Sequence, residues 1–208
     1  MEHLRQEQTT NPNICLSGGA AGADLEWGRC ASLSNHGVIH WSFPGYKTTA
    51  PEYQVIRLSD EETSIATDAL ASAAKVLGKT PPKKPTISRL LRRNYFQVAW
   101  ATCCYAVTVF RDAEEGEKVG GTAWAMVMFS LLHPGSRELY VFDMERDEWL
   151  QWHPNGNPDG DGEGMGEWVP IKSPPRPSGV WAGIGSRGSK GNGRDAIRRL
   201  MGCLDVEE

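Results

Sequence analysis

The sequence has no uninterrupted apolar run approaching the roughly 20 residues that a helix needs to cross a bilayer. Its N-terminus also lacks the order of basic, apolar and small residues that marks a signal peptide. Both absences argue against a membrane partner. We therefore expect a cytoplasmic protein.

Charge of either sign is not in large excess, because 22 basic residues oppose 26 acidic ones and the net charge is -4. A protein that follows the phosphate backbone of DNA or RNA needs a broad positive face. Outside the stretch from Lys79 to Arg93, patches of basic residues are scarce. A nucleic-acid partner is thus disfavoured, whereas a small anion needs only a local field and remains compatible.

Cysteine is scarce and unpatterned: there are five cysteines, an odd number, with one adjacent pair at Cys103-Cys104 and no CxxC. This favours reduced, buried thiols over a disulfide framework or a zinc site. The acidic stretch Asp159–Gly164 is similar to the start of a calcium loop, but Pro170 stands where the bidentate glutamate should be. We expect no metal and no cofactor.

The chain is long enough to bury a full core, with 208 residues of which 39% are hydrophobic. We interpret residues 1–208 as one domain. From about 144 to 178 the composition changes to Gly, Pro, Asp and Trp. This segment predicts an irregular excursion, or a hairpin on the edge of a sheet.

The stretch Ile14–Asp24 combines a short apolar run, a glycine turn and the start of a helix. Glycine lets an anion approach the backbone N–H groups, and the positive end of the helix dipole favours one. The alternative is a tight connection without a ligand. No Lys follows Gly22, so this is not a triphosphate-binding loop of the GxxxxGK[ST] kind.

Hydrophobic patterns and turn residues predict an alternation of strands and helices, which is typical of a parallel sheet. The predicted strands are 14–17, 38–43, 55–58, 105–110, 138–143 and 180–184, and the predicted helices are 24–34, 59–77, 86–103, 123–132 and 194–204. On the second strand and in the loop after it, three residues could reach a ligand: His40, Tyr46 and Lys47. Each is by itself typical of a solvated or core-edge position.

Two further glycine turns follow later strands, at Val119–Thr122 and at Gly183–Arg187. The helix before the first of them carries Arg93 and Asn94. Such a pair is usually a solvated face, yet arginine is also the side chain that forks onto phosphate. If the turns share the C-terminal edge of one sheet, they form a single nucleotide cradle.

Taken together, these motifs resemble the SLOG superfamily, the Rossmann-like nucleotide-binding group that includes the LOG phosphoribohydrolases and the DNA-processing protein A fold. Ser17–Asp24 looks like its GGxxG turn, Val119–Trp124 looks like its PGGxGT turn, and Arg93-Asn94 matches the place of its helix arginine. Ala182–Arg187 is similar to the family's opening strand and turn, but stands last here.

The resemblance therefore implies a circular permutation and covers nearly the whole chain except about 144–178. It implies an α/β fold, a Rossmann-like three-layer sandwich with a mainly parallel, doubly wound sheet. The C-terminal strand should be central, between the strands at 14–17 and 106–110.

The chain departs from the phosphoribohydrolases at their catalytic glutamate, because Met126 and Val127 occupy that part of the helix after the glycine turn. Neither side chain can act as an acid or a base. Asp24 or Glu26 could supply a displaced carboxylate. Trp124 could stack on a base, or be a buried helix residue.

Our leading hypothesis is a protein that binds a small phosphorylated nucleotide as a sensor or sequestering protein. The second is a nucleoside 5'-monophosphate phosphoribohydrolase, and the third is a nucleic-acid-binding module; whether the chain forms a homodimer is left open. The expected catalytic residues, for the enzyme alone, are Asp24 and Glu26. The expected ligand-binding residues are Ser17, Gly18, Gly19, Gly22, Arg93, Asn94, Gly120, Gly121, Thr122, Trp124, Gly185, Ser186 and Arg187.

Overall fold

A computed structural model describes the chain except residues 1–9, 110–119, 155–165, 189–190 and 205–208. Its strands are β1 (Ile14–Ser17), β2 (Gly37–Ser42), β3 (Val55–Arg57), β4 (Cys103–Thr108), β5 (Leu139–Asp143), β6 (Glu148–His153), β7 (Glu167–Ile171) and β8 (Val180–Gly185). Its helices are α2 (Ala23–Leu33), α3 (Asp60–Ser64), α4 (Thr67–Val76), α5 (Pro85–Val98), α6 (Gly121–Leu132) and α7 (Gly191–Met201), with a 3₁₀ turn, η1, at Glu52–Gln54.

All eight strands form one sheet in the order β3-β2-β1-β8-β4-β5-β6-β7. The pairs from β3 to β5 are parallel, and β6 and β7 continue the sheet antiparallel. The predicted central place of the C-terminal strand is confirmed, because β8 pairs with β1 on one side and with β4 on the other.

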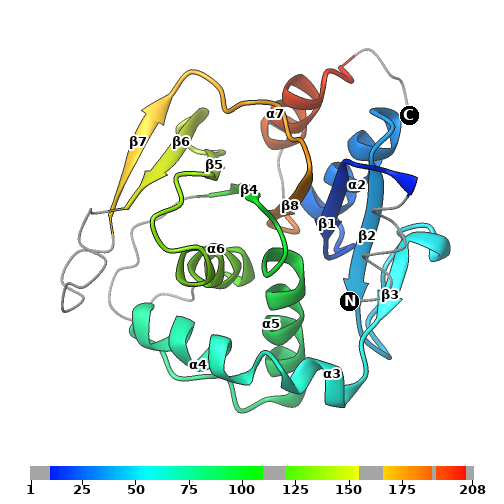
Figure 1. The fold of residues 1–208 in the computed structure, drawn as a ribbon, viewed down its shortest axis with the longest axis vertical. Coiled ribbons are helices and arrows are strands. Elements are labelled where there is room, and N and C mark those ends of the chain that lie inside the picture. The colour runs from blue at the N-terminus through cyan, green and yellow to red at the C-terminus, as the bar shows by residue number, and fades with distance from the viewer. Residues whose placement is uncertain (1–9, 110–119, 155–165, 189–190, 205–208) are drawn as a thin grey trace.

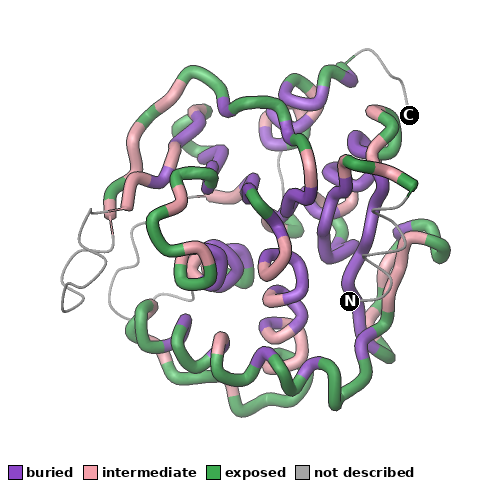
Figure 2. The backbone as a smooth tube through the Cα atoms, viewed as in Figure 1, coloured by how far each residue is buried: buried purple, intermediate pink, exposed green. Residues whose placement is uncertain are grey.

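Helices cover both faces of the sheet, which makes a Rossmann-like three-layer sandwich (Figure 1). One core lies between the sheet and α4, α5 and α6, and a second lies under α2 and α7. Every residue of β1 and β2 is buried, as expected for strands covered on both faces (Figure 2). Within the described residues, no helix is long and apolar enough to span a membrane.

Several predicted helix boundaries differ from the structure, and the helix expected over 194–204 is α7, Gly191–Met201. The helix expected over 59–77 begins with the predicted capping box of Ser59 and Glu62, but it breaks into α3 and α4. Hydroxyl groups of Thr63 and Ser64 donate to carbonyls three residues earlier, and such local bonds compete with the helical ladder.

The helix expected to reach Cys103 ends at Val98, and β4 begins at Cys103 instead of residue 105. The Thr102 N–H donates to the carbonyl of Val180 at 2.7 Å, so pairing with the central strand starts earlier than the apolar pattern indicates. Residue 110, the expected last strand residue, lies outside the described residues.

The segment 144–178 contains a hairpin on the sheet edge, as one of the two predicted alternatives. Strands β6 and β7 pair antiparallel beyond β5, and the rings of Trp152 and Trp168 lie 5.2 Å apart. The acidic stretch Asp159–Gly164 lies outside the described residues.

The centre of the sheet has no room for a side chain at Gly183. A Cβ built there would lie 2.6 Å from Cγ of Trp27, which packs on β8. We expect Gly183→Ala to lower the free energy of unfolding by about 1–3 kcal/mol in denaturant titrations, through overpacking. Gly188→Ala is the matched control, because a Cβ there meets no atom of the described residues within 4 Å. Equal stability of the two variants would contradict this account of the core.

Candidate functional site

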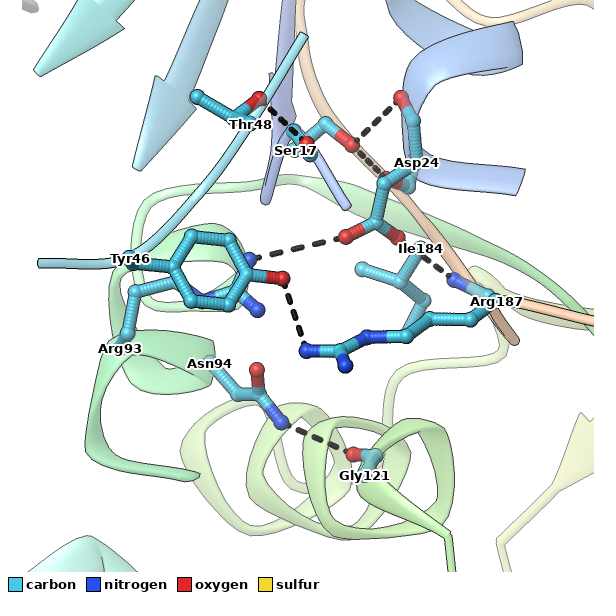
Figure 3. A network of polar contacts seen from close by, with 12 residues as sticks. Ser17, Asp24, Tyr46, Thr48, Arg93, Asn94, Gly121, Ile184 and Arg187 are labelled. Atoms are coloured by element: carbon cyan, nitrogen blue, oxygen red, sulfur yellow. Dashed lines mark hydrogen bonds and ion pairs between the residues drawn. The ribbon is translucent and has the colours of Figure 1, made fainter. Parts of the chain in front are cut away.

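A pocket of about 250 Å³ opens at the C-terminal edge of the sheet, where β8 lies between β1 and β4. In open α/β sheets, ligands bind at this edge, where the winding of the helices changes direction. Figure 3 shows the polar contacts around the pocket. Its lining residues are Ala20, Asp24, Leu90, Arg93, Asn94, Gln97, Thr108, Gly120, Gly121, Thr122, Ala125, Ile184, Gly185, Ser186 and Arg187.

The pocket therefore brings together most of the residues expected from the sequence. Turns from three separate parts of the chain meet there, after β1, before α6 and after β8, together with the middle of α5. The expected residues that line it are Asp24, Arg93, Asn94, Gly120, Gly121, Thr122, Gly185, Ser186 and Arg187; those that do not are Ser17, Gly18, Gly19, Gly22, Glu26 and Trp124.

A buried ion pair between α2 and α5 forms one wall of the pocket. The Asp24 Oδ1 atom accepts from the Gly185 N–H at 3.0 Å, and Oδ2 lies 3.6 Å from Nη1 of Arg93. Burial raises the pKa of the Asp24 carboxyl, and the Arg93 charge and the backbone hydrogen bonds from Ala20 and Gly185 offset only part of the rise. Asp24 thus links the ends of β1 and β8 to α5.

Arg93 is buried with fewer partners than a guanidinium normally has. The residue is 3% exposed, and neither Nε nor Nη1 has a hydrogen-bond partner within the described residues. A buried charge with unmet donors costs several kcal/mol unless an anion or further acceptors complete its environment. The site thus combines a cation with unsatisfied hydrogen-bond donors.

The first glycine turn serves the protein's own packing. A Cβ at Gly18 would lie 1.3 Å from the Arg93 guanidinium, so this glycine makes room for the arginine. Gly19 and Gly22 have positive φ angles of 61° and 93°. A Cβ built at Gly19 would approach Thr48, and one built at Gly22 would approach the backbone of Arg187. Protein atoms thus occupy the space beside Gly19, and this residue does not line the pocket.

Two other expected residues also serve the fold. The Ser17 hydroxyl is buried and lies within hydrogen-bond distance of the carbonyls of Gly183 and Asp24, at 2.6 and 3.1 Å. Trp124 is buried in the core under α5 and α6. Of the two alternatives for Trp124, the structure thus has the buried helix residue.

The second glycine turn leaves open space. Gly120 caps α6 with ordinary φ and ψ angles of -67° and 158°, and a Cβ there meets no atom within 4 Å among the described residues. The first N–H groups of a helix have no acceptor within the helix. Asn94 fixes the start of α6, because its Nδ2 donates to the Gly121 carbonyl at 2.9 Å.

Tyr46 belongs to the site, although the sequence treated it only as a residue that could reach a ligand. Its ring centroid lies 5.5 Å from Cζ of Arg93 and 5.6 Å from Cζ of Arg187. Its hydroxyl accepts from Nη2 of Arg187 at 3.0 Å. Arg187 is exposed and belongs to the pocket lining, so it is the more accessible of the two cations (Figure 3).

Sequence reasoning missed Gln97, which lines the pocket and is 2% exposed. The signal was available, because Gln97 follows Arg93 by four residues and so shares its helix face. Its Nε2 atom has no hydrogen-bond partner within the described ranges.

Glu26 lies outside the pocket. Two positions along a helix point in nearly opposite directions, so Glu26 faces away from Asp24. Its Oε1 accepts from Arg198 of α7 at 2.7 Å and from Arg29 at 3.2 Å. Burial acts to raise the pKa of Glu26, but these hydrogen bonds outweigh it and hold the pKa below its usual value. Glu26 instead borders a hollow of about 500 Å³ on the outer side of α2.

No protein-family model, curated protein or solved structure matches the chain. In the part of the chain that the structure describes, no group of three or more His, Cys, Asp or Glu side chains is positioned to hold a metal ion. The arrangement of the pocket is therefore the basis for a functional proposal.

His40, beside the first glycine turn, makes folding sensitive to acid. Burial, with the charge of Arg93, lowers its pKa from 6.5 to about 4. As the pH falls from 6.5 to 4, only the unfolded chain takes up this proton, so the free energy of unfolding falls, by up to about 3 kcal/mol. We expect His40→Leu to lose less stability over this range than the wild type in urea titrations. Identical pH profiles would refute this role.

The Glu26 carboxylate should stabilise the fold through its ion pairs with Arg198 and Arg29. We expect Glu26→Gln to lower the free energy of unfolding at pH 7 by about 1 kcal/mol, because it weakens a partly exposed ion pair. The effect should be full above the ordinary pKa of 4.5 and vanish as the pH falls through the lowered pKa. Urea titrations at several pH values measure it, and a loss that persists in acid would argue against the ion pair as its cause.

Proposed function

We propose that the protein binds a small phosphorylated nucleotide in the pocket between α5, α6 and the turn after β8, as a sensor or sequestering protein. The observation that carries the proposal is Arg93, a buried guanidinium that borders the pocket. Among the described residues its Nε and Nη1 have no hydrogen-bond acceptor, although Nη1 lies 3.6 Å from Oδ2 of Asp24. An anionic oxygen is the natural acceptor for such donors.

The charges of the lining support an anion. Arg93 and Arg187 oppose a single carboxylate, that of Asp24, among the lining residues. The N-terminus of α6 adds the partial positive charge of the helix dipole at Gly121 and Thr122. Phosphate would lie at the level of these N–H groups, within reach of the flexible Arg187 side chain.

The size of the pocket supports a small ligand. Its volume of about 250 Å³ is below the roughly 300–1,000 Å³ usual for ligand sites. It suits a phosphate with an adjoining sugar, and the base would then lie toward Tyr46. The resemblance of the glycine turns to the SLOG superfamily, in a circularly permuted order, favours a nucleotide over other phosphorylated compounds.

The second candidate, a nucleoside 5'-monophosphate phosphoribohydrolase, is favoured by one observation. Asp24 is a buried carboxyl with a raised pKa at the edge of the pocket, and perturbed groups in clefts are candidates for catalysis. However, both of its oxygens already face donors, Gly185 and Arg93. Met126 and Val127 offer no replacement. We therefore place binding without turnover first.

Thermal shift and calorimetry with AMP, GMP, ribose 5-phosphate and inorganic phosphate test the proposal. We expect stabilisation by AMP or GMP, with no free base detected by chromatography. Arg187→Ala should weaken the binding of the nucleotide by about 1.5–3 kcal/mol, the usual size of a hydrogen bond to a charged group. Gly120→Val should also abolish binding without unfolding the domain, because its side chain would enter the open pocket.

The matched control is Arg89→Ala. It removes an arginine of α5, the helix that carries Arg93, and this arginine pairs with Asp60. It should bind like the wild type. Absence of binding by all four compounds, or equal binding by the Arg187 and Arg89 variants, would overturn the proposal. Release of free base by the wild type but not by Asp24→Asn would establish the enzyme instead.

A further inference from the structure

Three lining residues of the pocket, one amide and two apolar side chains, lie further along their elements than the charged groups. Gln97 lies one helical turn after Arg93, Ala125 one turn after Gly121, and Ile184 one residue before Gly185, and all three line the pocket. Helices α5 and α6 flank the central strands, so these residues lie further from the sheet edge than the charged groups. We call these three residues, Gln97, Ala125 and Ile184, the floor of the pocket.

The Gln97 amide nitrogen, Nε2, belongs to this floor, is buried and has no hydrogen-bond partner among the described residues. Leaving a buried amide unpaired destabilises the folded state, and an apolar side chain of the same size would avoid that penalty. A half-turn of the amide exchanges its nitrogen and oxygen in the same space, so it can present either a donor or an acceptor.

The chemistry of the floor favours a neutral ligand group. Arg93, Arg187 and the N-terminus of α6 lie closer to the sheet edge, at the level proposed for phosphate. Beneath them, only Gln97 is polar on the floor, and its neighbours Ala125 and Ile184 cannot solvate a charge. A hydroxyl suits an amide there, since it both donates and accepts.

We propose that Gln97 binds a sugar hydroxyl of the phosphorylated nucleotide and thereby selects ligands with an intact ribose. This rests on the proposed function of the same pocket. The positions agree with the covalent structure of such a ligand, because one helical turn separates Gln97 from Arg93, a rise of about 5–6 Å. A phosphate near Arg93 and a sugar hydroxyl near Gln97 can belong to one molecule.

Two ligands and two proteins test the inference. Calorimetry compares AMP with 2',3'-dideoxy-AMP, on the wild type and on Gln97→Leu. We expect the wild type to bind AMP about tenfold or more tightly than the dideoxy compound, because the compound leaves the amide unpaired. Gln97→Leu should bind both with similar affinity, so the preference disappears with the amide.

A second measurement guards against a purely structural effect. We expect Gln97→Leu to melt at the same temperature as the wild type or higher, because an unpaired buried amide has been removed. Gln151→Leu is the matched control, since Gln151 lies on the distant strand β6 and its amide donates to the Arg137 carbonyl. It should keep the wild-type preference for AMP.

Three results would overturn the inference. The wild type could bind the two compounds equally, the preference could survive in Gln97→Leu, or that variant could melt at a clearly lower temperature. In each case AMP still binds, so the proposed function stands and only the role of Gln97 fails. If the wild type binds neither compound and also fails to bind GMP, ribose 5-phosphate and inorganic phosphate, the proposed function is refuted together with the inference.

Discussion

The contact between Asp24 and Arg93 is the interaction on which the site depends. It joins a helix from one face of the sheet to a helix from the other, across the ends of β1 and β8. Gly18 leaves room for the guanidinium, and the Gly185 N–H holds the other carboxylate oxygen. An ion pair that is incompletely hydrogen-bonded and fully buried stabilises a fold poorly. We interpret its retention as preparation of a positive site for an anion.

The alternation of strands and helices predicted a parallel α/β sheet, and the resemblance of the glycine turns to the SLOG superfamily implied the three layers and the central position of β8. Each strand is a short apolar run next to turn residues, and parallel pairing follows from the intervening helices. The break between α3 and α4 was missed because hydroxyl groups at Thr63 and Ser64 look, in sequence, like ordinary exposed helix residues. Their bonds to nearby carbonyls are decided by the local conformation.

The site was predictable where residues adjoin a turn, as at Gly120 and Arg187, and less so where packing decides. In sequence, Gly18 and Gly120 are the same kind of residue. A Cβ at Gly18 would collide with Arg93, whereas a Cβ at Gly120 would meet no described atom. Only the packing of the helices distinguishes the two glycines. Gln97 was missed although it shares a helix face with Arg93, and Tyr46 was named only as a residue that could reach a ligand, because its contacts with Arg93 and Arg187 exist only in the folded chain.

The place of β8 in the sheet has a consequence for folding. The strands β1 to β3 and β4 to β5 are all formed by residues that precede it in the chain, and Ile14 finally pairs with Val180. Until β8 arrives, these two groups of strands have unpaired edges where they will later meet it. Such edges can pair with other chains, and pairing between residues so distant in sequence is slow. A partly folded chain in which β8 is not yet paired therefore exposes strand edges that favour aggregation.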